Sequence, residues 1–260
     1  MVDSLKWAHM PSVRDDVKPL TIVHLFPELL NLYGDGGNVI ALTRRLQWRG
    51  LPVEVREIGM GDAMDFSQAD IVFIGGGADR EQMIVKDAMV ARKSELSAYV
   101  ADGGVLLAVC GGYQFLGHSY AMDDVVVEGL GVIDMETVRG EGRLIGNAVI
   151  QSDICDAPIV GFENHGGRTT LGPDAKPLGR VLGKTFGNNG EDGFEGVHQG
   201  NLIGTSCQSP ETRILYHIRS GKSRAFRAKR GLHPEDNKCK RLEFKRFDKT
   251  QEYTILIVVG

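Results

Sequence analysis

The sequence predicts an α/β fold in which a mostly parallel sheet is flanked by helices. Short apolar segments alternate with segments of helical periodicity in the first half of the chain, which is typical of strands joined by helical crossovers. The apolar segments are almost uninterrupted, as expected of strands that are covered on both faces. In such a sheet the loops that follow the strands lie along one edge, where ligands bind.

The first elements follow in regular order. An apolar run at residues 20–26 predicts a buried strand, and apolar positions at helical spacing predict a helix over residues 39–48, which ends at Gly50. Residues 53–58 alternate as a strand does, and residues 71–74 form a second apolar strand.

The next elements lead to the most informative segment. Residues 80–100 predict one long helix, residues 105–109 another buried strand, and a further helix begins at about Gly112. Beyond Met122 the pattern changes to glycine-rich, strand-like pieces at residues 125–127, 132–134, 144–150 and 159–163.

Composition limits the class of protein. The chain has 260 residues, 42% of them hydrophobic and 25% charged, which fits one large globular domain or a domain with an appendage. Its apolar runs are too short to cross a bilayer, and its first twenty residues lack the apolar core of a secretory signal. The four cysteines are scattered without metal-binding spacing, so we expect a reducing, cytoplasmic environment and no metal site.

The charge changes sign near the end of the chain. Residues 209–260 contain 13 Lys and Arg and 6 Asp and Glu, a charge of +7. Since the whole chain carries −4, residues 1–208 carry the difference, −11. A basic tail is compatible with a solvated extension or with an anionic partner such as nucleic acid.

The segment VLLAVCGGYQFLG, residues 105–117, poses the central question about Cys110. A free cysteine at the end of a strand is commonly only buried. Two glycines before a helix, however, permit a tight turn, and a helix N-terminus lowers the pKa of a thiol. The amide of Gly111 follows the thiol, and the triglycine segment of residues 75–77 brings Gly76 to the same sheet edge. Together these features favour a nucleophile with two oxyanion donors, Gly111 and Gly76.

VCGGYQFLG resembles the nucleophile elbow of class I glutamine amidotransferases, particularly the branch related to cobyric acid synthase. Three further segments, LYGDGGN (residues 32–38), GFENHGGRTTLG (residues 161–172) and GNNGEDGFEG (residues 187–196), extend the resemblance. Over residues 20–205 the chain is similar to glutaminase subunits of lipid II isoglutaminyl synthases. The resemblance implies a flavodoxin-like fold with the elbow after a central strand.

The resemblance also implies a reaction and a partner. L-glutamine would be hydrolysed to glutamate and ammonia through a thioester on Cys110. The ammonia would pass to a Mur-ligase-like subunit in a heterodimer, which amidates D-glutamate of the lipid II stem peptide. ATP and Mg²⁺ are expected on that partner and no cofactor in this chain, and neither membrane insertion nor nucleic-acid binding is expected. The chain lacks a fused ATP-binding synthetase domain, which disfavours a cobyrinate-type amidotransferase.

Arg143, in GRLIGN, matches the arginine that in this family binds the substrate carboxylate about thirty residues after the nucleophile. A guanidinium forms a forked pair with a carboxylate, which lysine does not reproduce. The alternative is an arginine in a surface ion pair.

The other polar candidates have structural explanations. We expect His165 and Arg168 to brace a glycine turn by hydrogen bonds, and Asp35 and Asn38 to cap a helix. LYGDGGN lacks the spacing of a phosphate loop. Residues 187–196 suggest a flexible acidic turn at a subunit interface, and His118 lies about two helical turns beyond Cys110, out of reach of its thiol.

The base that should accompany Cys110 is missing. The family carries a histidine in a GTYLHGP-like motif, whereas this chain has GTSCQSP at residues 204–210, with Gln208 at the histidine position. Glutamine does not exchange a proton near neutral pH. His198 and His217 are the substitutes to consider.

The resemblance ends where the charge changes sign. We predict an N-terminal extension over residues 1–19, an amidotransferase domain over residues 20–208 and a basic segment over residues 209–260. Because motif, charge and periodicity are lost together, our hypothesis is that residues from about Ser206 onward derive from a shifted reading frame or a comparable replacement. If neither of the other two frames encodes a YLHGP-like motif, this hypothesis fails. A nucleic-acid-binding tail is the alternative, but it has few aromatic residues.

Two functions stay open at this point. The chain is either a glutaminase subunit that works with a ligase partner, or a glutaminase-like binding subunit whose turnover is impaired because Gln208 replaces the base.

Overall fold

The computed structural model describes residues 18–208, except 33, 64, 123–124 and 155–157, and the backbone of two further strands, β14 (Ile214–Ser220) and β15 (Tyr253–Val259). Cys155 and Cys239, together with most of the basic segment, lie outside these residues. β14 and β15 pair with each other in antiparallel orientation.

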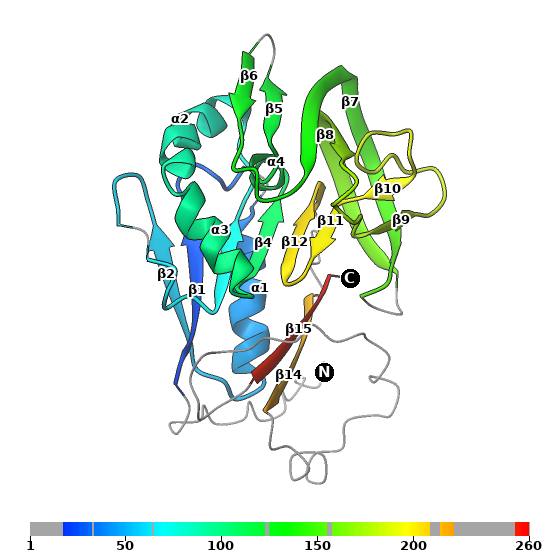
Figure 1. Cartoon of the computed structure of the whole chain (residues 1–260). Helices are drawn as coiled ribbons and strands as arrows, with labels where there is room; N and C mark the ends of the chain where they lie inside the picture. Colours follow the sequence, from blue (N-terminus) through cyan, green and yellow to red (C-terminus); the bar gives the residue numbers. More distant parts are fainter. Residues whose placement is uncertain are drawn as a thin grey trace, which may run out of the picture.

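A six-stranded sheet forms the centre of the molecule, in the order β11-β12-β4-β3-β1-β2 (Figure 1). Five of its strands are parallel and β11 is antiparallel at one edge. The predicted α/β class with a mostly parallel sheet is therefore confirmed. The strands are β1 (Leu20–Leu25), β2 (Val53–Ile58), β3 (Ile71–Ile74), β4 (Val105–Val109), β11 (Val197–Gln199) and β12 (Leu202–Thr205).

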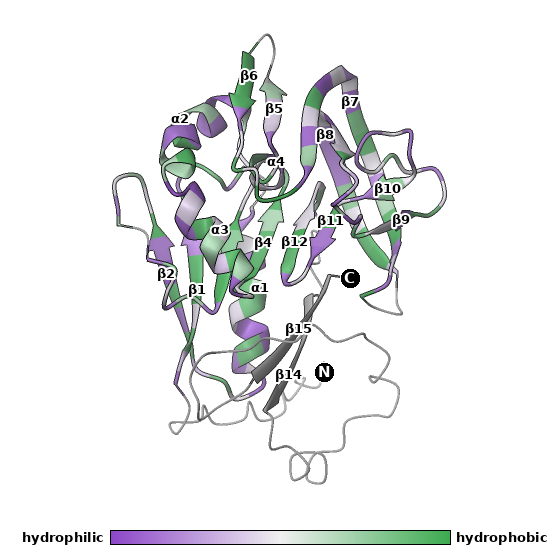
Figure 2. Ribbon diagram, viewed as in Figure 1, coloured by the Kyte–Doolittle hydropathy of each residue, from purple (hydrophilic) through white to green (hydrophobic). Residues whose placement is uncertain are grey.

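Helices cover both faces of this sheet. Leu42 and Leu46 of α1 (Gly36–Gln47) pack with residues of one face, such as Phe73. Val85 of α2 (Asp79–Val90) and Leu96 of α3 (Lys93–Ala101) pack on the other face. Because neighbouring side chains of a strand point to opposite faces, strands covered on both faces are largely apolar. β3 and β4 are apolar throughout, whereas β1 also buries Thr21 and His24. Figure 2 shows β1 and β4 as largely hydrophobic.

Three predicted elements need correction. The helix expected over residues 80–100 is two helices, with a break at residues 91–92. The helix after Cys110, α4 (Gly111–Phe115), has five residues only. Residues 132–134 form no strand, because the amides of Val132 and Ile133 both donate to the Leu116 carbonyl and not to a neighbouring strand.

A second, seven-stranded sheet was not predicted as a unit. Its path is β10-β9-β7-β5-β6, with β8 beside β7 and β13 beside β8. β7 and β8 form a long antiparallel pair whose register shifts between Arg139 and Leu144. The strands are β5 (Ser119–Met122), β6 (Val125–Glu128), β7 (Met135–Ser152), β8 (Ile159–Leu171), β9 (Gly179–Val181), β10 (Phe194–Glu195) and β13 (Cys207–Gln208).

The two sheets are joined at Ser206. Thr205 is the last residue of β12 and pairs with Val109 in the first sheet. Cys207 begins β13 and pairs with Glu163 in the second sheet. Since β12 lies beside β4, this change of sheet occurs next to the end of β4. Within the described part of the chain, no helix is long and apolar enough to cross a membrane.

Candidate active site

Cys110 occupies a strained turn between β4 and α4. Its backbone has φ 52° and ψ −112°, a region that residues with a side chain rarely adopt and that costs about 1–3 kcal/mol. The Cys110 amide donates to the Thr205 carbonyl at 2.8 Å, and the Gly112 amide donates to the Gly75 carbonyl at 3.1 Å. Hydrogen bonds to both neighbouring strand ends thus hold the turn, and Cys110 as a whole residue is half-buried. This geometry matches that of a nucleophile elbow.

Glycines allow the backbone to close around this turn. A Cβ on Gly76 would lie 2.9 Å from Cys110 Cβ and 3.4 Å from its sulfur. A Cβ on Gly111 would lie 2.7 Å from the Gln82 side-chain nitrogen. The Gly111 amide itself donates to the Cys110 sulfur. The structure therefore brings together the three residues that the sequence suggested, Cys110, Gly76 and Gly111.

Gly76→Ala is expected to slow alkylation of the Cys110 thiol by iodoacetamide by about tenfold or more, because the new methyl group presses on the cysteine side chain and misplaces it. The rate is measured at Cys110 by mass spectrometry of the digested protein. Gly37→Ala in α1 is the matched control, since a Cβ there meets nothing within 4 Å. An unchanged rate in Gly76→Ala would mean that Gly76 does not confine the thiol.

The pKa of the Cys110 thiol is raised, whereas a thiol at a helix N-terminus was expected to have a lowered pKa. Burial raises it to about 11, and the Asp35 carboxylate contributes to the rise. The Gly111 amide, the Arg143 charge and the Gln208 side chain act against it without cancelling it. The lowering expected from a helix N-terminus does not prevail, because α4 is short and the loss of solvation is larger. The thiol is therefore protonated near neutral pH.

Gln208 lies where a catalytic base would act. It is in β13, paired with Phe162, and its side chain hydrogen-bonds the Cys110 thiol. His198 bonds through Nε2 to the Gly200 carbonyl in the β11–β12 hairpin, at the end of β12 away from the elbow. The side chain of His217 lies outside the described residues. His118 pairs with Asp134, as expected of a residue away from the thiol.

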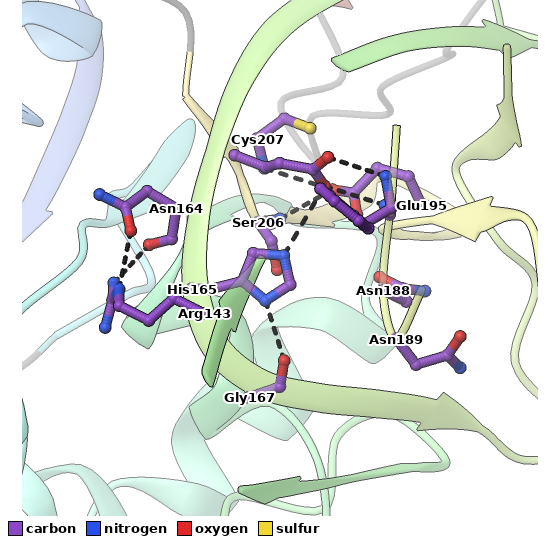
Figure 3. A network of polar contacts seen from close by, with 12 residues as sticks. Arg143, Asn164, His165, Gly167, Asn188, Asn189, Glu195, Ser206 and Cys207 are labelled. Atoms are coloured by element: carbon purple, nitrogen blue, oxygen red, sulfur yellow. Dashed lines mark hydrogen bonds and ion pairs between the residues drawn. The ribbon is translucent and has the colours of Figure 1, made fainter. Parts of the chain in front are cut away.

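Arg143 projects from β7 and is fixed by Asn164 of β8. Its Nε donates to Asn164 Oδ1 at 2.8 Å, and its Nη2 donates to the Asn164 carbonyl at 2.7 Å (Figure 3). The guanidinium is exposed but close enough to favour the Cys110 thiolate. A fixed cation near the thiol is suited to hold a substrate carboxylate.

His165 and Arg168 brace backbone, as predicted, although they do so within strand β8 and not at a turn. His165 Nδ1 donates to the Gly167 carbonyl at 2.9 Å, and Arg168 donates to the carbonyls of Gly166 and Glu141. The buried Glu163 carboxylate accepts the Phe186 and Gly187 amides and lies 3.8 Å from His165 Nε2. Burial opposes its ionisation, but His165 and these amides hold the pKa of Glu163 below its ordinary value.

Two glycine-rich loops differ from expectation. Asp35 stands at the start of α1 without a side-chain capping bond, and Asn31 Oδ1 accepts the Gly36 amide at 2.8 Å instead. Residues 187–196 are closed by their own polar side chains: buried Asn188 accepts bonds from Tyr113 and Gly196. The two ends of this loop are therefore built into the core, whereas its acidic tip at residues 190–192 is exposed.

Sequence reasoning missed three residues that shape the site. Gln82 is buried against Gly111 and donates to the Gly77 carbonyl at 2.8 Å. Asn164 orients Arg143, and Glu195 binds the backbone beside Gln208. Asn164 and Glu195 lie inside the quoted glycine-rich segments, but nothing in those segments distinguishes them from polar surface residues. The described residues contain no group of three side chains suited to hold a metal ion.

Comparisons with known proteins agree with this geometry. Residues 21–207 match the family model of the CobB/CobQ-like glutamine amidotransferase domain. The chain is 46% identical over 200 residues to the lipid II isoglutaminyl synthase (glutamine-hydrolyzing) subunit GatD of Staphylococcus aureus, covering 76% of this chain and 81% of that protein.

Two other relatives belong to the same group. The chain is 41% identical to subunit GatD of Streptococcus pneumoniae, covering 74% of each protein. It is 30% identical to a probable cobyric acid synthase of Methanothermobacter thermautotrophicus, covering 70% of this chain and 38% of that protein. The strained cysteine, its neighbouring glycines and these matches lead to one conclusion: the chain belongs to the family of CobB/CobQ-like glutamine amidotransferase domains.

Proposed function

We propose that this protein is the glutaminase subunit of a lipid II isoglutaminyl synthase, with Cys110 as its nucleophile. The observation that carries the proposal is Cys110 itself, held at positive φ against Gly76 and the Gly111 amide. The similarity to two GatD subunits supports the substrate and pathway.

The geometry supports a thioester mechanism. The Cys110 sulfur attacks the carboxamide carbon of L-glutamine, and the amides of Gly111 and Gly76 stabilise the oxyanion of the tetrahedral intermediate. The thiol proton passes to the amide nitrogen and the C–N bond breaks. Ammonia departs, and a glutamyl thioester remains on Cys110. Water attacks the thioester, which releases glutamate and returns the thiol. Arg143 binds the α-carboxylate of the glutamine throughout.

Ammonia is the product that the partner consumes. We propose that it passes to a Mur-ligase-like subunit, which activates the D-glutamate carboxyl of the stem peptide with ATP and Mg²⁺ and forms the amide. The two subunits form a heterodimer in the cytoplasm, and residues 20–208 form the domain that carries the glutaminase site. We propose no cofactor for this chain.

A second candidate is favoured by a specific observation, the contact between Gln208 and the Cys110 thiol. With a thiol pKa of about 11 and an amide beside it, the site has no described group that forms the thiolate and protonates the leaving nitrogen at neutral pH. On this hypothesis the chain binds its partner and glutamine, but its turnover is impaired.

The two candidates are separated by glutamate release from L-glutamine. The chain and its Gln208→His variant are each measured alone and with the purified partner subunit. Equal turnover by both proteins would exclude a binding subunit with impaired turnover. Turnover that appears only in Gln208→His would exclude an active glutaminase subunit. Absence of turnover and of glutamine binding in every combination would contradict the proposed function as a whole.

Arg143→Lys, measured in the Gln208→His background, is expected to raise the KM for glutamine by about 10- to 100-fold with a smaller effect on kcat. Lysine keeps the charge but loses the forked, charge-assisted contact, which contributes about 1.5–3 kcal/mol. Arg168→Lys is the control, since Arg168 binds backbone carbonyls of its own sheet. A KM that stays unchanged in Arg143→Lys would remove Arg143 from the glutamine site.

A further inference from the structure

The buried carboxylate of Glu195 has no part in the reaction described above. Glu195 ends β10 and is fully buried. Its oxygen Oε1 accepts three hydrogen bonds, from Thr205 Oγ1 at 2.6 Å, from the Ser206 amide at 2.8 Å and from the Cys207 amide at 3.3 Å (Figure 3). A carboxylate is costly to bury unless such bonds compensate for the lost water.

All three donors belong to one short segment, which we call the sheet crossover (residues 205–207). There the chain leaves β12 in the first sheet and enters β13 in the second. The Thr205 hydroxyl also accepts a hydrogen bond from the Cys207 amide at 3.0 Å. The crossover is therefore held by the Glu195 carboxylate and by a bond within the segment itself. At this point neither sheet provides a ladder partner for the Ser206 amide, and Glu195 provides it.

The sheet crossover touches the elbow on one side and residue 208 on the other. The Thr205 carbonyl accepts the Cys110 amide at 2.8 Å. Gln208, directly after the crossover, hydrogen-bonds the Cys110 sulfur. The distance between the thiol and the side chain at position 208 therefore depends on the path of residues 205–207, and Glu195 is the side chain that binds all three.

We propose that Glu195 is a positioning residue, which sets the sheet crossover so that the side chain at position 208 lies against the Cys110 sulfur. This inference rests on the proposed glutaminase function, because it assigns Glu195 a role in placing the side chain at position 208 beside the proposed nucleophile. Glu195 touches no reacting atom and acts through the backbone.

The test uses the full-length chain and the pH profile of Cys110 alkylation by iodoacetamide, followed by mass spectrometry. In the Gln208→His variant an imidazolium next to the thiol is expected to lower its apparent pKa by about 1–3 units. Adding Glu195→Leu should reverse most of this shift, since leucine accepts no hydrogen bond. Adding Glu195→Gln instead should retain most of it, because the amide oxygen still accepts. Asp35 and Arg143, the charged groups that act on Cys110, are unchanged in all variants.

Glu163→Leu, also in the Gln208→His background, is the matched control. Glu163 is as buried as Glu195, but its carboxylate accepts the amides of Phe186 and Gly187. It meets Cys207 of the crossover through the pairing of β8 with β13, which the substitution leaves in place. Glu163→Leu should lower the melting temperature of the protein and leave the pH profile of Cys110 alkylation unchanged. Where Glu195→Leu does not fold, Thr205→Val removes the hydroxyl that bonds both Glu195 and Cys207, and a partial reversal is expected.

The outcomes are distinct. A folded Glu195→Leu protein that keeps the lowered pKa would overturn the positioning role, and so would equal effects of Glu195→Leu and Glu163→Leu. A Gln208→His variant without any shift would overturn it as well, since position 208 would then not act on the thiol. A normal shift that Glu195→Leu reverses, without glutamate release from Gln208→His, would contradict the proposed function and still support the role of Glu195.

Discussion

If Gln208 impairs turnover, replacing it with histidine is expected to raise the kcat of glutamate release by about 10²–10⁴-fold, the usual contribution of a positioned acid–base group. The expectation follows from the contact between the Gln208 side chain and the Cys110 sulfur. An imidazole at that place takes the thiol proton, holds the thiolate as an ion pair and returns the proton to the leaving nitrogen. Glutamine retains the contact but transfers no proton.

The measurement is initial-rate glutamate release from L-glutamine between pH 6 and 9, with and without the partner subunit. Gln208→Leu is the matched control, because leucine fills a similar volume and carries no proton; it should show no gain. Turnover by the unchanged chain that equals that of Gln208→His would mean that another group serves as the base.

Replacing Cys110 with serine or alanine, in the Gln208→His background, is expected to lower glutamate release by at least about 10³-fold. Effects of this size and larger are found when a covalent nucleophile is removed. Serine is the more informative variant, because its hydroxyl fits the strained turn but ionises far less readily than a thiol. Both variants should keep the melting temperature, since the backbone bonds of the turn remain.

Cys207→Ala is the control for this prediction. Cys207 is buried beside the Glu195 and Glu163 carboxylates, and burial raises the pKa of its thiol well above the ordinary value. We therefore expect this variant to lose some stability and to retain glutamate release. If Cys110→Ser keeps its activity and Cys207→Ala loses it, the nucleophile has been assigned to the wrong cysteine.

The parallel sheet and the elbow were predictable from the sequence because their signals are local. The bounds of β2, β3 and β4 agree with prediction, since an apolar or alternating run bounded by polar and glycine residues specifies a strand. The turn at Cys110 was indicated by the two glycines after an apolar strand. The second sheet was not, because its strands are short, irregular or shifted in register, and their pairing depends on distant partners.

The break at residues 91–92 shows the limit of periodicity. Residues 80–100 keep a helical pattern across the break, so that the pattern alone predicts one helix. The structure ends α2 at Val90 and begins α3 at Lys93. The apolar residues Met89 and Leu96 lie on either side of the break and both contact the same sheet face, which a single straight helix across the twisted sheet would not favour.

The sequence by itself determined which residues are candidates for the chemistry: a cysteine on a glycine turn, an arginine suited to a carboxylate, and a glutamine where the resemblance predicts histidine. Only the tertiary structure decided how they act on one another. Cys110 and Gln208 are far apart in the chain and meet because β12 lies beside β4 and the chain changes sheet at Ser206. The raised pKa of Cys110 arises mainly from burial, and Cys110 packs against a core cluster that contains residues of both sheets. Contacts and desolvation of this kind depend on long-range packing, which no local pattern of residues encodes.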